Sequence, residues 1–122
     1  MQNNPYQKIM QQSVNTMTPV QLLIALYEKG EIELTKAIYY IENKDIPNAH
    51  NSIIKAQKII QTLDSSLKEK YEVSKSLGSL YDYMYRRLIE ANVKKDTEIL
   101  KEIIPFFREL KETFSEINRR GY

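Results

Sequence analysis

The segment from Tyr81 to Leu88 places three tyrosines and two adjacent arginines within about two helical turns. These two residue types combine a large contact area with a polar tip, and they are enriched where one protein holds another. Tyrosines at helical spacing also line the boundary of many bundle cores, with their hydroxyl groups reaching water. The segment therefore indicates either a protein-binding surface or core packing, and spacing alone leaves both interpretations open.

The two arginines of this segment have different expected roles. Arg86 belongs to a ladder of alternating charges that runs in four-residue steps from Asp82 to Lys94. Such pairs stabilise a helix by a few tenths of a kcal/mol each, and they are usually solvated. We therefore expect Arg86 to serve its own helix, while Arg87 is freer to meet a partner or to stack on Tyr83.

Side chains suited to catalysis are scarce. The chain has one histidine, His50, and no cysteine, which excludes thiol catalysis, disulfide bonds and thiolate metal sites. A carboxylate di-metal bundle needs Glu-x-x-His pairs, and the residue three positions before His50 is Pro47. No glycine-rich phosphate loop is present. We expect a protein that is not an enzyme and has no cofactor or metal, with His50 at the edge of the core.

The charge balance argues against nucleic acid as a partner. Lys plus Arg number 18 and Asp plus Glu number 16, in mixed order, so attraction to a phosphate backbone should be weak. The longest apolar run, Leu22 to Tyr27, is too short to cross a membrane, and the first residues do not resemble a signal peptide. A chain without cysteine fits a reducing cytosol. We therefore expect a cytosolic protein without membrane insertion.

Helical periodicity runs through most of the chain. Thr18 and Gln21 around Pro19 form the pattern of a capping box, and Asp45 and Asp96 are suited to cap later helices. Apolar residues then recur at steps of three and four. The predicted helices span about 19–42, 46–66, 71–95 and 97–118.

Two residues disturb this regular pattern. Gly30 lies in the middle of the first helix, where glycine costs about 1 kcal/mol relative to alanine, so we expect a neighbouring backbone to approach closely there. Pro105 removes a backbone hydrogen bond and clashes with the preceding turn, so we expect a kink or short break near Ile104.

Four amphipathic helices with short connections can bury their apolar stripes only against one another. The sequence therefore predicts an all-α, antiparallel up-down-up-down four-helix bundle over residues 18–119, with a frayed tail at 120–122. Residues 1–17 are predicted to form a short N-terminal arm, helical or extended, because apolar residues recur in it at about one-turn spacing. A frayed terminus is the alternative for this arm.

Apolar doublets such as Ile53-Ile54 and Ile59-Ile60 supply more apolar surface than a narrow helical seam consumes. This surplus thickens the core or forms a groove for a foreign helix, and the arm could cover such a groove when it is empty. Helix-in-groove recognition of another protein therefore fits the sequence best. Whether the surplus also produces a homodimer is left open.

Several separate segments, in the right order and over nearly the whole length, resemble the FliS family of flagellar secretion chaperones. The segments are Asn3-Asn4-Pro5-Tyr6, Ser13-Val14-Asn15-Thr16, Thr18-Pro19 with Leu22 to Tyr27, Ile53 to Ile60 with Lys55-Ala56-Gln57, and Tyr81 to Leu88 continuing through Ala91-Asn92.

The resemblance implies a bacterial cytosolic chaperone that binds the C-terminal region of flagellin. Such a chaperone prevents premature polymerisation and keeps the subunit competent for flagellar type III export. The resemblance also implies hand-over to export-gate components. The alternative is a helical adaptor or regulatory bundle that binds another cytosolic protein. Pro105 departs from the family, whose fourth helix is usually uninterrupted.

The resemblance also assigns candidate partner-binding residues by position. Three come from the arm, others match the first-helix motif or the tyrosine-rich segment, and Ile54 comes from the apolar surplus. In the first-helix motif, core and groove residues are not separated. The predicted partner-binding residues are Tyr6, Ile9, Met10, Leu22, Leu23, Tyr27, Ile54, Tyr81, Tyr85 and Arg87.

Overall fold

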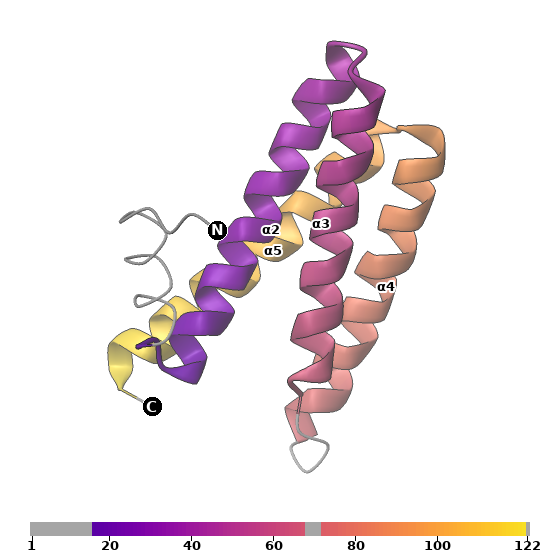
Figure 1. The fold of residues 1–122 in the computed structure, drawn as a ribbon. Helices are drawn as coiled ribbons and strands as arrows, with labels where there is room; N and C mark the ends of the chain where they lie inside the picture. The colour runs from indigo at the N-terminus through magenta and orange to yellow at the C-terminus, as the bar shows by residue number, and fades with distance from the viewer. Residues whose placement is uncertain (1–15, 68–71, 122) are drawn as a thin grey trace, which may run out of the picture.

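The computed structural model describes residues 16–67 and 72–121, and these residues form four long helices with no strand among them (Figure 1). Their bounds are Pro19–Glu42 for α2, Ile46–Ser65 for α3, Glu72–Lys94 for α4 and Thr97–Arg120 for α5. The prediction of an all-α four-helix bundle is confirmed. Most of the predicted N-terminal arm lies outside the described residues.

Local hydrogen bonds explain where the helices begin. The hydroxyl oxygen of Thr18 accepts a bond from the Gln21 backbone N–H at 3.1 Å, and the Gln21 side-chain oxygen accepts one from the Thr18 N–H at 3.0 Å. This is a complete capping box. Asp45 and Asp96 likewise accept bonds from backbone N–H groups in the first turns of α3 and α5.

The four helices form a ring in which each has two neighbours. α2 packs on α3 and α5, and α4 packs on the same two helices but makes fewer close contacts with them (Figure 1). All four helices contribute to one core. Its largest fully buried apolar side chains are Tyr27, Leu34, Ile53, Ile60, Leu63, Tyr81, Met84, Leu88, Leu100, Ile103 and Phe107.

The contact between α2 and α5 explains the glycine in the middle of α2. A Cβ atom on Gly30 would lie 2.5, 2.7 and 2.8 Å from three ring carbons of Phe107. The close neighbour is thus an aromatic side chain, and the expectation of a neighbouring backbone was wrong. Because the Phe107 ring is fully buried, glycine lets α5 carry a large side chain at this crossing.

The last helix continues through its proline. α5 is continuous from Thr97 to Arg120 with Pro105 inside it, so the expected short break is absent from the described chain. The Pro105 ring is exposed, while Ile103, Ile104 and Phe107 around it remain buried. A kink of the helix axis at this point stays a prediction.

None of the described helices has a stretch long and apolar enough to span a membrane.

Candidate binding site

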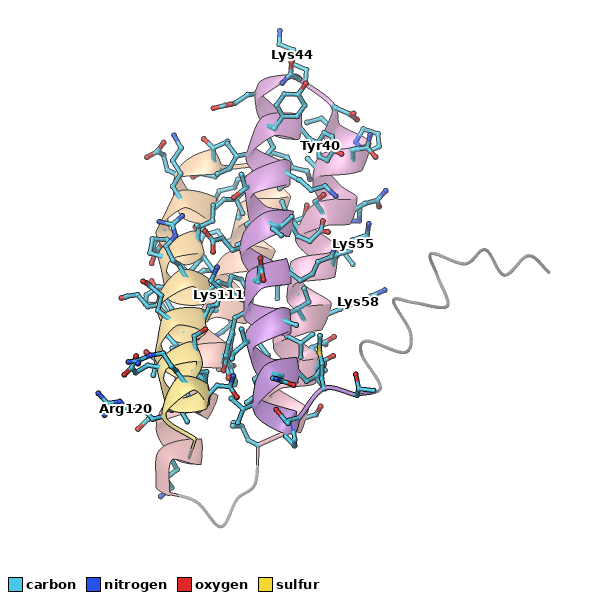
Figure 2. All side chains as sticks on the ribbon, turned by 90° about the vertical axis from the view of Figure 1, so that its left-hand side faces the viewer. Tyr40, Lys44, Lys55, Lys58, Lys111 and Arg120 are labelled. Carbon is cyan, nitrogen blue, oxygen red and sulfur yellow. The ribbon has the colours of Figure 1, made fainter. Side chains whose placement is uncertain are left out.

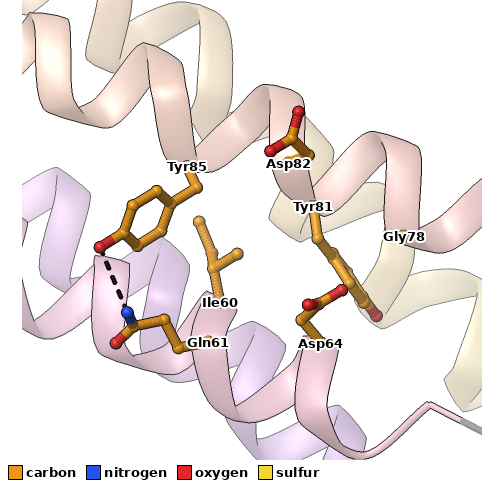
Figure 3. A pocket seen from close by; sticks show the side chains of 7 residues that line it. All are labelled: Ile60, Gln61, Asp64, Gly78, Tyr81, Asp82 and Tyr85. Atoms are coloured by element: carbon orange, nitrogen blue, oxygen red, sulfur yellow. Dashed lines mark hydrogen bonds between the residues drawn. The ribbon is translucent and has the colours of Figure 1, made fainter.

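A pocket of about 240 Å³ opens between α3 and α4, and we call it the α3/α4 pocket (Figure 3). It brings together two of the predicted site residues, Tyr81 and Tyr85. Side chains one turn apart on each helix face it, as expected for residues spaced three and four apart. The pocket is lined by Ile60, Gln61, Asp64, Gly78, Tyr81, Asp82 and Tyr85.

Gly78 limits how far the wall on α4 reaches into the pocket. A Cβ atom added there would have Leu67 Cδ1 at 3.8 Å and the Asp64 carboxylate oxygen Oδ1 at 3.9 Å as its nearest neighbours. Both distances are ordinary van der Waals contacts, so the pocket has room for a methyl group at this point. The absent side chain therefore leaves open space beside Asp64.

Tyr81 joins the pocket to the bundle core. Its side chain is 1% exposed, and its hydroxyl lies 2.6 Å from the hydroxyl of Tyr27 on α2. Burial raises the pKa of both hydroxyl groups, and the Asp64 carboxylate adds to the rise at Tyr81. Both tyrosines therefore remain protonated, and one donates its hydrogen to the other. This placement fits the core-packing interpretation of Tyr81.

Tyr85 forms the other aromatic wall, and its side chain is half-buried. Its hydroxyl oxygen accepts a hydrogen bond from Gln61 Nε2 at 3.2 Å, which connects α4 to α3 across the pocket mouth (Figure 3). One face of the ring therefore packs on the bundle while its polar tip stays at the surface.

The two carboxylates of the pocket differ in their ion pairing. Asp82 accepts a bond from Arg86 Nε at 3.0 Å, and both side chains are about two-thirds exposed, at 66% and 67%. Among the described side chains, those of residues 16–67 and 75–121, Asp64 takes part in no ion pair. Figure 3 shows its carboxylate beside the Tyr81 ring. The described pocket therefore carries one negative charge without a counter-charge.

Arg87 lies on the opposite side of α4, toward α5. Its guanidinium donates to Glu90 at 2.6 Å and to Glu102 at 2.8 Å, and the Tyr83 hydroxyl also donates to Glu102. The bonds from Tyr83 and then Arg87 hold the pKa of Glu102 below its usual range. The expectation that Arg87 would be freer than Arg86 was wrong, because Arg87 links two helices.

The predicted residues of α2 do not line the α3/α4 pocket. Tyr27 is fully buried, Leu23 is half-buried against the core, and Leu22 is 41% exposed near the start of the helix. Their role in partner binding stays a prediction. Tyr6, Ile9 and Met10 lie outside the described residues.

Ile54 lines a second pocket, of about 270 Å³, between α2 and α3. Three lysines surround it, Lys36, Lys55 and Lys58, and Figure 2 shows Lys55 and Lys58 on one face of the bundle. The structure thus separates Ile54 from the pocket that Tyr81 and Tyr85 share.

Sequence reasoning did not identify Ile60, Gln61, Asp64, Gly78 or Asp82 as pocket residues. One signal was available, because a glycine inside a helical pattern usually has a packing or functional reason. Gly78 is such a glycine, and it lies one turn before the tyrosine-rich segment, so its position pointed to a pocket there.

The described side chains offer binding and little chemistry. Within this part of the chain, no group of three or more His, Cys, Asp or Glu residues could hold a metal ion. His50 is exposed and hydrogen-bonds Asn92, at 3.0 Å from its amide nitrogen. The α3/α4 pocket has aromatic, aliphatic and carboxylate walls but no nucleophile paired with a base. Fold and site together define a four-helix bundle with an open pocket between α3 and α4.

Comparison with known proteins makes this class specific. Residues 1–121 match the family model described as flagellar protein FliS. The chain is 41% identical over 113 residues to the flagellar secretion chaperone FliS of Bacillus subtilis, covering 93% of this chain and 85% of the relative. It is 32% identical over 116 residues to the flagellar secretion chaperone FliSB of Pseudomonas aeruginosa, covering 93% and 92%. The chain belongs to the FliS family, a family of chaperones and not of enzymes.

A solved structure shares the fold. A crystal structure described as a flagellar chaperone from bacteria superimposes with a TM-score of 0.79 at 20% sequence identity, covering 94% of this chain and 95% of that one. The resemblance inferred from the sequence segments is therefore confirmed at the level of family and fold.

Proposed function

We propose that this chain is a flagellin-specific chaperone of the bacterial cytosol. It binds the C-terminal region of flagellin, prevents premature polymerisation and keeps the subunit competent for flagellar type III export. Membership of the FliS family carries the proposal, because the matched relatives are named flagellar secretion chaperones. The absence of cysteine fits the reducing cytosol in which such a chaperone would work.

Exposed apolar side chains support a protein client. Large apolar residues that are more than about one-third exposed occur on three of the helices: Leu22, Ile32 and Tyr39 on α2, Ile46 on α3, and Tyr83, Ile89 and Val93 on α4. An amphipathic helix binds its target by burying one apolar face against such residues.

The mechanism we propose is competitive burial. In a filament, flagellin hides its terminal helices against neighbouring subunits. A chaperone that covers the same apolar stripe prevents that contact and so blocks nucleation. Binding a segment that is otherwise disordered also keeps it unfolded enough to be threaded through the export channel. An interface of this kind buries about 1,000 to 3,000 Å² and costs a few kcal/mol of ordering.

The decisive experiment is co-elution of the purified chain with a peptide from the C-terminal region of flagellin. An N-terminal flagellin peptide is the matched control, because it comes from the same subunit. We expect a complex with the C-terminal peptide only. Equal retention of both peptides, or of neither, would contradict the proposal and favour a helical adaptor for another cytosolic protein.

Two further parts of this proposal concern assembly. The loaded chaperone should be retained by export-gate components, which a pull-down with and without flagellin measures. Sedimentation of the free chain distinguishes a monomer from a homodimer.

A further inference from the structure

We propose that the α3/α4 pocket seats a lysine or arginine side chain of the client, with Asp64 as its counter-charge. This inference rests on the proposed function for the identity of the client. It goes further by naming the type of client residue that the pocket accepts and the residue of this chain that selects it.

The charge of the pocket selects a cation. Asp82 is already neutralised by Arg86 at 3.0 Å, whereas Asp64 has no ion pair within the described residues. Asp64 also lies close enough to Tyr81 to add to the rise that burial produces in the pKa of its hydroxyl. A client carboxylate would be repelled by the unpaired charge of Asp64, and a client ammonium or guanidinium group would be attracted by it.

The walls of the pocket suit the stem of a long basic side chain. The half-buried Tyr85 ring presents apolar surface next to the carboxylate, and the buried Ile60 forms the floor beneath it. Lysine and arginine bury their methylene stems on such surfaces while the charged head stays polar. The Tyr85 ring adds attraction for a cation placed over its face.

The size of the pocket favours one side chain over a free small molecule. Its volume of about 240 Å³ is smaller than the roughly 300 to 1,000 Å³ of typical ligand sites. Gly78 keeps this space open, because a Cβ atom there would lie 3.9 Å from the Asp64 oxygen. A methyl group at Gly78 would therefore narrow the α3/α4 pocket without changing the charge of the pocket.

The main test compares Asp64→Asn with Asp82→Asn, which each replace a carboxylate by a neutral amide of the same shape. Calorimetric titration of the full chain with the C-terminal flagellin segment measures the affinity of each variant. Loss of a charge-assisted bond should weaken binding of the Asp64→Asn variant by about tenfold or more. The Asp82→Asn variant should lose less than about threefold, because its carboxylate already has a partner on α4. Gly78→Ala should weaken binding as well, through shape alone.

A double-mutant cycle identifies the client residue. Each lysine and arginine of the segment is replaced by methionine in turn, and one of these changes should have no further effect in the Asp64→Asn background. A charge exchange, Asp64→Lys against glutamate at that client position, should recover part of the affinity. Thermal melting of each variant is the control for folding. We expect unchanged melting temperatures, because both aspartates lie at the surface.

Unchanged affinity of the Asp64→Asn variant, or equal losses for Asp64→Asn and Asp82→Asn, overturns the inference and leaves the proposed function standing. If the wild-type chain does not bind the segment, the proposed function fails instead. An NMR titration with N-acetyl-arginine amide, against N-acetyl-norleucine amide, then decides the inference. We expect shifts at Asp64, Gly78 and Tyr85 with the cation only, and shifts with neither probe or with both contradict it.

Discussion

The hydroxyl groups of Tyr27 on α2 and Tyr81 on α4 lie 2.6 Å apart inside the bundle. They connect two helices that are not neighbours in the ring of four. Each hydroxyl is buried, and each satisfies the other. The pair therefore fixes the distance between opposite sides of the core, and its two members should depend on one another energetically.

Removing one hydroxyl of this pair should lower the free energy of unfolding by more than half of what removing both hydroxyls does. Tyr27→Phe or Tyr81→Phe leaves the remaining hydroxyl buried without its partner, which lowers the free energy of unfolding by about 1 to 3 kcal/mol. The double variant should lose clearly less than the sum of the two single losses. Urea denaturation of the four proteins measures this, and additive losses would show that the hydroxyl contact contributes nothing.

Alanine at Gly30 and alanine at Gly78 should change the stability of the bundle in opposite directions. At Gly30 the new methyl group would meet Phe107 ring carbons at 2.5 to 2.8 Å, so Gly30→Ala should destabilise the bundle by about 1 to 3 kcal/mol through overpacking. At Gly78 the nearest atoms are 3.8 and 3.9 Å away, so Gly78→Ala should gain up to about 1 kcal/mol from helix propensity. Melting temperatures give both signs, and a stabilising Gly30→Ala would refute the packing argument.

Glu33 should make the bundle sensitive to acid. Its side chain is 0% exposed, with Lys29 Nζ at 2.9 Å and Lys36 Nζ at 3.6 Å. Burial alone would raise the pKa of this carboxyl, but the bond from Lys29 and the charges of Lys29, Lys36 and Lys55 outweigh it, and the pKa is lowered.

A lowered pKa in the folded chain means that ionised Glu33 favours folding above the pKa of the unfolded chain, about 4.3. That stabilisation is lost as the pH falls from there through the lowered folded value. Glu33→Gln should therefore remove part of the acid-side slope when unfolding is measured from pH 7 to pH 3. Parallel curves for the two proteins would contradict the assignment.

The neighbouring arginines offer a matched comparison of stability. Arg87 connects α4 to α5 through Glu102, whereas Arg86 pairs with Asp82 inside α4. Arg87→Met should lower the melting temperature more than Arg86→Met, and the difference should shrink at high salt because these pairs are solvent-accessible. Equal melting temperatures would mean that the bond between helices adds no stability.

Deletion of residues 1–17 tests the predicted arm. If the arm covers apolar surface, its removal should increase binding of a hydrophobic dye and change the affinity for flagellin. Removal of residues 121–122 is the control for shortening the chain. Unchanged dye binding together with unchanged affinity would refute a covering role.

Local signals made the fold predictable. Caps at Thr18, Asp45 and Asp96 and apolar residues at steps of three and four lie within single helices, so the sequence displays them directly. Four amphipathic helices with short connections then leave few ways to bury their apolar faces. The class of fold follows from these features without knowledge of any contact between helices.

The site was less predictable because its geometry depends on those contacts. Tyr81 and Tyr85 stood out by residue type, but Asp64 belongs to the pocket only because α3 and α4 meet face to face. The role of Arg87 was misjudged for the same reason, whereas Arg86 pairs with Asp82 within α4 as expected. Spacing along one helix reveals Asp82 as a partner but cannot reveal Glu102, which comes from α5.

The helices of the ring do not pack equally closely, so one of them, α4, can move with the least loss of packing. α4 makes fewer close contacts with α3 and α5 than α2 does, so an outward tilt of α4 separates less helix packing than a similar tilt of α2, although it also stretches the contact between the Tyr27 and Tyr81 hydroxyl groups. The α3/α4 pocket lies at one of these weaker contacts, the one between α3 and α4. The α3/α4 pocket can therefore widen for side chains of unequal bulk at a modest cost in free energy.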